Sequence, residues 1–200
     1  LIAAVYPYTS LEASRSAQLP SMNDDQGSIA LVSPEGLIID ATKYSEDFHS
    51  ELVRNKEGVS LERISPDKSS ITSSNWSSAS ARVGYASPGT VNSSSVHELM
   101  SPATERLHLM PVVFEPISGT PNHTVVTIKM DKPGFVGKLM VIDLQGRIIK
   151  TLASNELLGL EDIYKWDGDT DTGLQATIGS YIVWLEAFNS EGEKIISRSR

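Results

Sequence analysis

The feature that most constrains this chain is a series of short segments in which apolar and polar residues alternate, each ended by turn residues. The clearest segment, residues 124–130, would place four side chains on one face of a strand: Thr124, Val126, Ile128 and Met130. No apolar run approaches the roughly 18–20 residues that a membrane-spanning helix needs, and no helical pattern is long enough for a βαβ crossover. The chain is therefore predicted to be all-β, with antiparallel sheets.

Three pairs of these segments are separated by turn residues such as Pro, Gly and Asn, and so predict β-hairpins. Their strands are expected at residues 28–32 and 37–44, 139–144 and 147–152, and 181–188 and 193–197. Residues 59–64 give a weaker strand signal, residues 46–54 fit one short helical turn, and residues 155–160 are too short to be more than a turn.

Serine divides the chain into two halves, since it supplies 21 of the first 100 residues and 7 of the last 100. Residues 87–102, between the halves, are rich in Ser, Pro and Gly and lack a sustained apolar period, as linkers do. We therefore predict two β-sandwich modules, at residues 1–95 and 107–200, joined by a linker at residues 96–106.

Charge and cysteine content exclude several classes of function. The 17 Lys and Arg against 25 Asp and Glu give a net charge of -8, which would repel nucleic-acid phosphates. With no cysteine, the chain can form no disulfide, thiolate nucleophile, zinc-thiolate site or iron–sulfur cluster. Because the sequence begins with Leu, we expect it to be a processed or truncated piece of a longer protein.

Three motifs in residues 41–93 follow one another in a specific order: ATKYSEDFH, EGVSLERISP and GYASPGTVNS. In this order they resemble the C-terminal half of bacterial lamin-tail domains, over about residues 21–93. The resemblance implies an immunoglobulin-like β-sandwich with EGVSLERI in a core strand. The N-terminal half of that family is not evident in residues 1–27, so either the chain starts inside the domain or those strands are lost. A sandwich that is incomplete in this way would expose a sheet edge.

Residues 107–200 carry a second set of motifs: GKLMVIDLQGRIIKTL, then Trp166-Asp167-Gly168 and Gly179-Ser180-Tyr181. They resemble the C-terminal Ig-like modules of secreted bacterial proteins, related to the Ig-like domain of the flagellar hook-capping protein. The resemblance implies a second sandwich of about seven strands. Such modules often end surface or secreted chains and can carry sorting information for outer-membrane export. We therefore expect the protein outside the bacterial cell or on its outer-membrane surface.

The most metal-like run holds three carboxylates at alternate positions, as in the first half of an EF-hand loop: Asp167, Asp169 and Asp171. Thr172 and Ile178 occupy the positions at which that loop needs Gly and a bidentate Glu. The mismatch favours consecutive Asx turns, with neighbouring glycines at positive φ. A Ca²⁺ site at these carboxylates is the alternative, and no other cofactor is expected.

No motif for catalysis is present, so the prediction is a protein that is not an enzyme. The four histidines show no spacing typical of zinc enzymes: His49, His97, His108 and His123. No serine lies in GxSxG or SxxK, and no phosphate-binding glycine loop occurs. His49, which follows Glu46 and Asp47, is interpreted as a surface ion-pair partner.

Aromatic residues are the remaining candidates for ligand binding. Trp166 is predicted to anchor the end of the second module, and Trp184 is expected to be buried on a strand face shared with Ile182 and Phe188. Trp76, the large group of the serine-rich residues 65–80, is expected to pin that loop, and it is the candidate for contact with polysaccharide.

Together these observations predict a non-catalytic extracellular or cell-surface accessory region. It would anchor, display or space a domain N-terminal to it, with a protein or a cell-envelope glycan as partner. A carbohydrate-binding module is the alternative, and a fragment of a secreted hydrolase is the second alternative.

Overall fold

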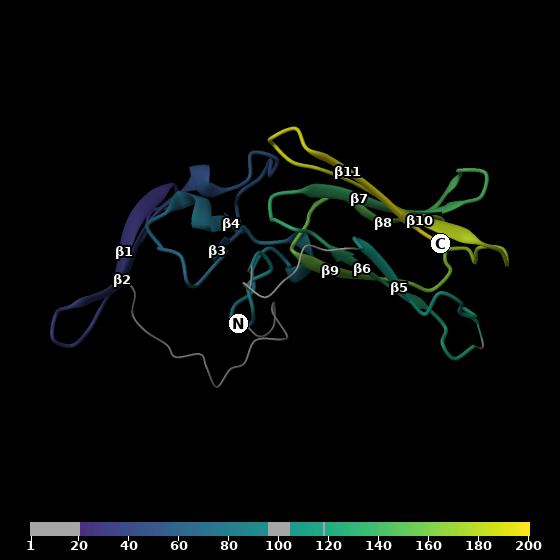
Figure 1. Ribbon diagram of the computed structural model, residues 1–200, viewed down its shortest axis with the longest axis horizontal. Coiled ribbons are helices and arrows are strands. Elements are labelled where there is room, and N and C mark those ends of the chain that lie inside the picture. Colours follow the sequence, from purple (N-terminus) through teal and green to yellow (C-terminus); the bar gives the residue numbers. More distant parts are fainter. Residues whose placement is uncertain (1–20, 96–104, 118) are drawn as a thin grey trace. The chain divides into compact units, whose positions relative to one another are not determined.

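The computed structural model describes residues 21–95, 105–117 and 119–200, and the chain divides into two compact units, Leu1–Leu99 and Met100–Arg200 (Figure 1). Every strand pair among these residues is antiparallel, which confirms the prediction of an all-β chain. Within the described ranges, no helix has the length and apolar character needed to cross a membrane. Residues 1–20 and most of the predicted linker at 96–106 lie outside the description, so the linker stays a prediction.

In its described residues, the first unit contains two small sheets, β1–β2 and β3–β4, and three single-turn 3-10 helices. In chain order its elements are β1 (Gln26–Val32), β2 (Ile38–Ser45), η2 (Glu46–Phe48), β3 (Leu61–Arg63), η3 (Ser73–Asn75), β4 (Trp76–Ser78) and η4 (Ala81–Val83). The predicted first hairpin and the short helical turn after it are confirmed as β1–β2 and η2. The weak strand signal of residues 59–64 corresponds to the three residues of β3.

The interior of the first unit, in its described residues, is mainly polar. Ala79 is its one buried apolar residue, whereas eight buried residues carry polar or charged side chains: Glu62, Ser65, Ser70, Asn75, Ser77, Ser78, Ser80 and Ser94. The Asn75 side chain accepts a hydrogen bond from the Ser65 N–H and donates one to the Ser65 carbonyl, both at 2.9 Å. Hydrogen bonds of this kind hold the serine-rich loop together.

The second unit contains seven described strands in two sheets, with orders β11-β10-β7-β8 and β5-β6-β9 (Figure 1). The strands are β5 (Leu107–Met110), β6 (Thr124–Lys129), β7 (Val136–Asp143), β8 (Ile148–Leu157), β9 (Glu161–Trp166), β10 (Tyr181–Phe188) and β11 (Lys194–Ser199). The predicted hairpins β7–β8 and β10–β11 are confirmed. The arrangement is sandwich-like.

Apolar side chains from both sheets form the core of the second unit. Val126 and Ile128 of β6, Leu139 and Val141 of β7, and Leu185 of β10 are fully buried. All four residues predicted to share a face in residues 124–130 are buried, so the alternation identified the inward face of β6 correctly.

Two expectations for this unit are wrong. Residues 155–157 belong to strand β8, with Asn155 at a φ of 54°, and are not part of a separate turn. Trp184 is half-buried and not buried as expected. Strand β10 directs Val183, Leu185 and Ala187 into the core, so Trp184 lies on the opposite, outer face. Both faces of β10 are apolar, so alternation alone does not say which one the partner sheet covers.

Candidate functional site

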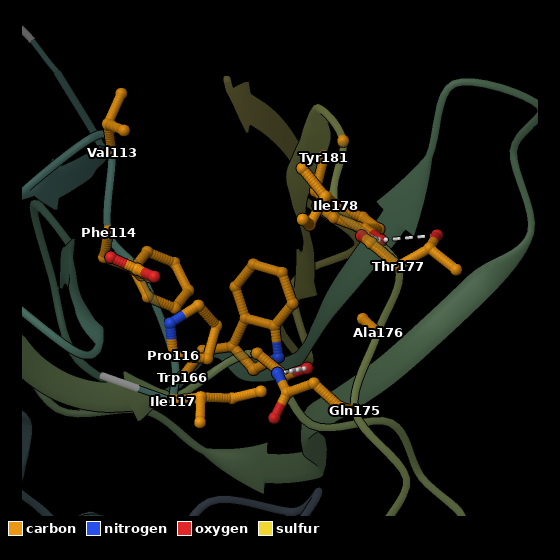
Figure 2. A pocket seen from close by; sticks show the side chains of 13 residues that line it. Val113, Phe114, Pro116, Ile117, Trp166, Gln175, Ala176, Thr177, Ile178 and Tyr181 are labelled. Atoms are coloured by element: carbon orange, nitrogen blue, oxygen red, sulfur yellow. Dashed lines mark hydrogen bonds between the residues drawn. The ribbon is translucent and has the colours of Figure 1, made fainter. Parts of the chain in front are cut away.

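A groove of about 420 Å³ lies in the second unit, where two loops meet (Figure 2). One loop joins β5 to β6, and the other joins β9 to β10. The lining residues are Val113, Phe114, Glu115, Pro116, Ile117, Trp166, Gly168, Gln175, Ala176, Thr177, Ile178, Gly179 and Tyr181. Its volume falls in the range of small-molecule and side-chain pockets, about 300–1,000 Å³.

Gly168 allows the two loops to approach each other. Its φ is +84°, and a Cβ atom there would lie 2.5 Å from Gln175 Nε2 and 2.7 Å from Pro116 Cγ, which is too close for either contact. The Gly168 carbonyl accepts hydrogen bonds from the Ala176 N–H at 2.8 Å and from Gln175 Nε2 at 2.6 Å. A glycine at this position therefore fixes the shape of the groove.

Three aromatic rings from different segments form the inner part of the groove (Figure 2). Trp166, at the end of β9, makes edge-to-face contacts with Phe114 at a centroid distance of 5.5 Å and with Tyr181 at 5.2 Å. Trp166 is buried, and its indole N–H donates to the Asp169 carbonyl at 2.9 Å. The structure confirms Trp166 as an anchor and adds that it forms part of the groove.

The groove offers mainly apolar surface to a ligand. Val113 and Ile117 are 82% and 84% exposed at its rim, and Ile178 is fully exposed. The polar donors of the aromatic rings are already engaged, because Tyr181 donates its hydroxyl to the Thr177 carbonyl and Trp166 donates to Asp169. The site is therefore suited to apolar side chains rather than to a ligand that needs many hydrogen bonds.

The charge around the groove is acidic. Its lining includes Glu115 and no Lys, Arg or His, and the exposed Asp167 follows Trp166 directly. Nearby, Lys150 is engaged by Asp169, whose hydrogen bond raises the pKa of the lysine. A basic group on a ligand would therefore meet a favourable potential beside the groove.

Two of the three carboxylates of the candidate calcium run, Asp169 and Asp171, make separate contacts. Asp169 pairs with Lys150, and Asp171 accepts hydrogen bonds from the Thr151 N–H at 2.8 Å and the Thr151 hydroxyl at 3.1 Å. Asp171 thus ties its loop to β8 and does not cap its own turn as expected, although both neighbouring glycines have positive φ. Over the described residues, no group of three or more His, Asp or Glu is arranged to hold a metal ion.

Trp76, the glycan candidate, is half-buried in β4 opposite Arg63. Its indole N–H donates to the Ser70 carbonyl at 2.8 Å, so the ring pins the serine-rich loop as expected. A role in glycan binding stays a prediction.

The structure brings one serine and one histidine together, over a separation of 29 residues. His49 Nδ1 lies 2.9 Å from Ser78 Oγ, which also accepts the Ser50 N–H at 3.1 Å. Burial lowers the pKa of His49, with the nearby Lys56 as a second cause. Because Ser78 is only 2% exposed, substrate has no direct access to its hydroxyl. We interpret the pair as a structural contact that fastens the segment after η2 to β4.

The other histidines make local contacts. His108 lies 3.8 Å from Glu105, and His123 Nδ1 lies 2.8 Å from Asn122 Oδ1, both at exposed positions. His97 is outside the described residues.

Sequence reasoning missed the groove, although a signal was present. Val113, Ile117 and Ile178 are large apolar residues in loop segments rich in Pro and Gly, where no strand pattern accounts for them. Comparison with known proteins adds no identification, since no family model and no curated protein matches the chain. The fold and the groove together describe a β-sandwich-like unit with an apolar groove.

Proposed function

We propose that the chain is a non-catalytic accessory region on the outside of a bacterial cell, and that its second unit anchors it to a partner protein through the groove. The rest of the chain would display or space a domain that precedes it. The observation that carries this proposal is the apolar, aromatic-lined groove, whose rim residues stay exposed while a separate apolar core stabilises the unit.

The chemistry of the groove favours an apolar protein segment as its occupant. Exposed rim residues such as Ile117 and Ile178 lose contact with water when an apolar side chain covers them, and each Å² removed contributes about 25 cal/mol. Edge-to-face rings beneath the rim provide flat apolar surfaces for such a side chain. A polysaccharide would find few unengaged polar groups in the same place.

The acidic surroundings specify the occupant further. Glu115 in the lining, Asp167 beside it and the net charge of -8 favour a segment whose apolar residues are flanked by Lys or Arg. Charge complementarity of this kind raises the association rate and disfavours acidic competitors.

The finer architecture belongs to the same proposal. The seven strands of the second unit lie in sheets of four and three, as an Ig-like module requires. We assign the first unit to an incomplete lamin-tail-like sandwich on the motifs of residues 41–93. The location at the bacterial surface follows from the same two resemblances.

Titration of the complete chain, followed by amide NMR signals, tests the proposal. The probe is a synthetic peptide of alternating isoleucine and valine with a lysine at each end. We expect it to shift signals of residues 113–117 and 175–181, and Ile178→Asp to weaken binding at least about tenfold by placing a charge at the apolar rim.

The matched control is Leu144→Asp, which places the same charge at an exposed leucine of the β7–β8 turn, outside the groove lining. Equal loss of binding in both variants, or no binding of the peptide, would overturn the proposal. A parallel titration with cellohexaose and chitohexaose separates the alternative. Binding of either sugar that Trp76→Ala abolishes would establish the carbohydrate-binding module instead.

A further inference from the structure

The hairpin β1–β2 exposes large apolar side chains on both of its strands. Ile29 and Leu31 of β1 are 46% and 60% exposed, and Ile38 and Ile39 of β2 are more exposed still. Within the described part of the chain this sheet has two strands and no further partner strand. A two-stranded hairpin is at best marginally stable in water, whereas three or more strands with an apolar face are stable.

The two outer edges of this hairpin differ. The β2 edge is covered by the serine-rich loop, because Ser70 donates to the Ala41 carbonyl at 2.7 Å and Thr42 donates to the Ser70 carbonyl at 2.8 Å. Asp40 of the same strand is held by Arg63 at 3.1 Å. No described residue forms a comparable contact with the backbone edge of residues 28–30 in β1. Among the described residues, one edge is therefore closed and the other is open.

The open edge lacks the features by which proteins block strand pairing. β1 has the sequence QGSIALV, which contains no charged residue and no proline. Its single irregularity, between Leu31 and Val32, lies next to the turn and leaves residues 26–30 regular.

Register identifies the backbone groups on this edge. The Glu46 N–H donates to the Asp25 carbonyl at 2.7 Å, in line with the register of the pair. Because bonded pairs alternate along antiparallel strands, Ser28 and Ala30 direct their N–H and carbonyl groups outward.

We propose that β1 pairs antiparallel with β1 of a second copy of this chain, about a two-fold axis at Ile29. In that register, Ser28 of each copy pairs with Ala30 of the other, and the outward N–H and carbonyl groups are all used. The result is a four-stranded sheet of order β2-β1-β1-β2. The strand is uncharged, so self-pairing opposes no like charges. The covered edge of β2 ends the assembly at two copies, because an isologous contact closes on itself.

A seven-residue strand contributes a small interface, below the ~1,200 Å² typical of stable complexes, so the dimer is concentration-dependent. Sedimentation velocity of the complete chain from about 1 μM to about 1 mM should show a monomer becoming a dimer. Ala30→Pro should weaken dimerisation at least about tenfold, because proline removes an outward donor while a solvent-facing edge position tolerates it. Leu37→Pro is not a suitable control, since the Leu37 N–H and carbonyl are both used in the turn.

The matched control is therefore Leu37→Lys, which removes an apolar side chain that is 69% exposed in the same hairpin but outside β1. It should leave the dimer intact. If it disrupts association as strongly as Ala30→Pro does, general apolar contact is responsible and strand pairing is wrong. A chain that stays monomeric throughout the concentration range also overturns the proposal. That is the result expected if residues 1–20 of the same chain cover the edge.

Cross-linking gives a second readout that does not depend on the strength of the dimer. The chain contains no cysteine, so Ile29→Cys introduces a single thiol, which the two-fold axis places about 5 Å from its copy, Cβ to Cβ. Mild oxidation should give a disulfide-linked dimer from Ile29→Cys at least about tenfold faster than from Leu37→Cys. Equal rates for the two variants would overturn the pairing. This proposal concerns the first unit, so its failure would leave the groove of the second unit unaffected.

Discussion

The two units of this chain are stabilised by different interactions. In the described residues of the first unit, the buried side chains are serines, Asn75, Glu62 and a single apolar residue, Ala79, whereas the second unit buries leucine, valine and isoleucine from two sheets. Hydrogen bonds are directional and each contributes about 1 kcal/mol net, while apolar burial is non-directional and grows with area. The stability of the serine-rich first unit therefore depends on specific hydrogen-bond partners. The stability of the second unit depends on how completely apolar side chains fill its core.

The carboxylate of Glu62 illustrates the first kind of interior. It is buried and accepts hydrogen bonds from the Ser87 and Ser93 hydroxyls and from the Ser94 N–H at 3.2 Å. Three donors from one loop thus replace the water that the carboxylate loses. The loss of one hydrogen-bond partner should therefore destabilise a core of this kind more than the loss of one methylene group.

Truncation of the apolar core gives the largest expected effect. Leu139→Ala, at a fully buried position of β7, should lower the free energy of unfolding of the second unit by about 2–5 kcal/mol, because a cavity replaces the side chain. Urea titration followed by NMR signals assigned to each unit measures it. Leu144→Ala, at an exposed leucine, should change stability little, and a comparable loss there would contradict the contrast between core and surface.

Removal of one buried hydrogen-bonding side chain tests the polar interior. Asn75→Ala leaves the Ser65 N–H and carbonyl without their partner, so we expect a loss of about 1–3 kcal/mol in the first unit. The same urea titration measures it. Asn55→Ala, where the side chain caps an exposed turn through the Glu57 N–H, serves as the control. If both asparagines prove equally tolerant, the polar interior does not stabilise the unit.

Mild acid should weaken the first unit through His49. Burial lowers the pKa of this histidine below 6.5, so the unfolded chain binds more protons than the folded unit between the two pKa values. The contribution of neutral His49 to the stability of the first unit is fully present above about pH 6.5. It is lost as pH falls toward the pKa of His49 in the folded unit. Urea midpoints of the first unit should therefore decrease over this window. His49→Gln should flatten this dependence, and an unchanged slope in that variant would assign it to another group.

The smallest effect is expected for an ion pair on the surface of the second unit. Lys132 lies 2.8 Å from Glu191 and 2.9 Å from Glu193, and hydrogen bonds to these carboxylates raise the pKa of the lysine. All three side chains are exposed, so water and salt weaken their attraction. Lys132→Ala should leave the urea midpoint of the second unit unchanged within error, at low and at high salt. A clear salt-dependent loss would show that this unit depends on electrostatics as well as on its core.

Strand positions in the second unit were largely predictable, because period-two alternation and turn residues are local properties of a sequence. Thr124, Val126 and Ile128 face inward as their spacing predicts. Trp184 was assigned to the wrong face, since both faces of β10 are apolar and the choice depends on the opposite sheet. Strand β9 was missed because residues 161–166 mix charged and aromatic side chains and do not show a simple alternation of apolar and polar residues.

The candidate site was less predictable than the fold. Each groove residue is unremarkable in its own segment, and the loops that bring Phe114, Trp166 and Tyr181 together are separated by about fifty residues in sequence. The same holds for His49 and Ser78, which meet across 29 residues. Contacts at such separations depend on how the chain packs, which no local pattern specifies.

By itself the sequence determined the all-β class, the hairpins and the contrast between a serine-rich half and an apolar half, because these depend on composition and on neighbouring residues. Tertiary structure alone decided that exposed loop residues form a groove over Trp166 and that serines donate hydrogen bonds to the buried Glu62. It also decided that, among the described residues, β2 has a covered edge and β1 an open one. The physical reason is that burial and edge pairing are properties of surfaces, which exist only after distant segments have packed together.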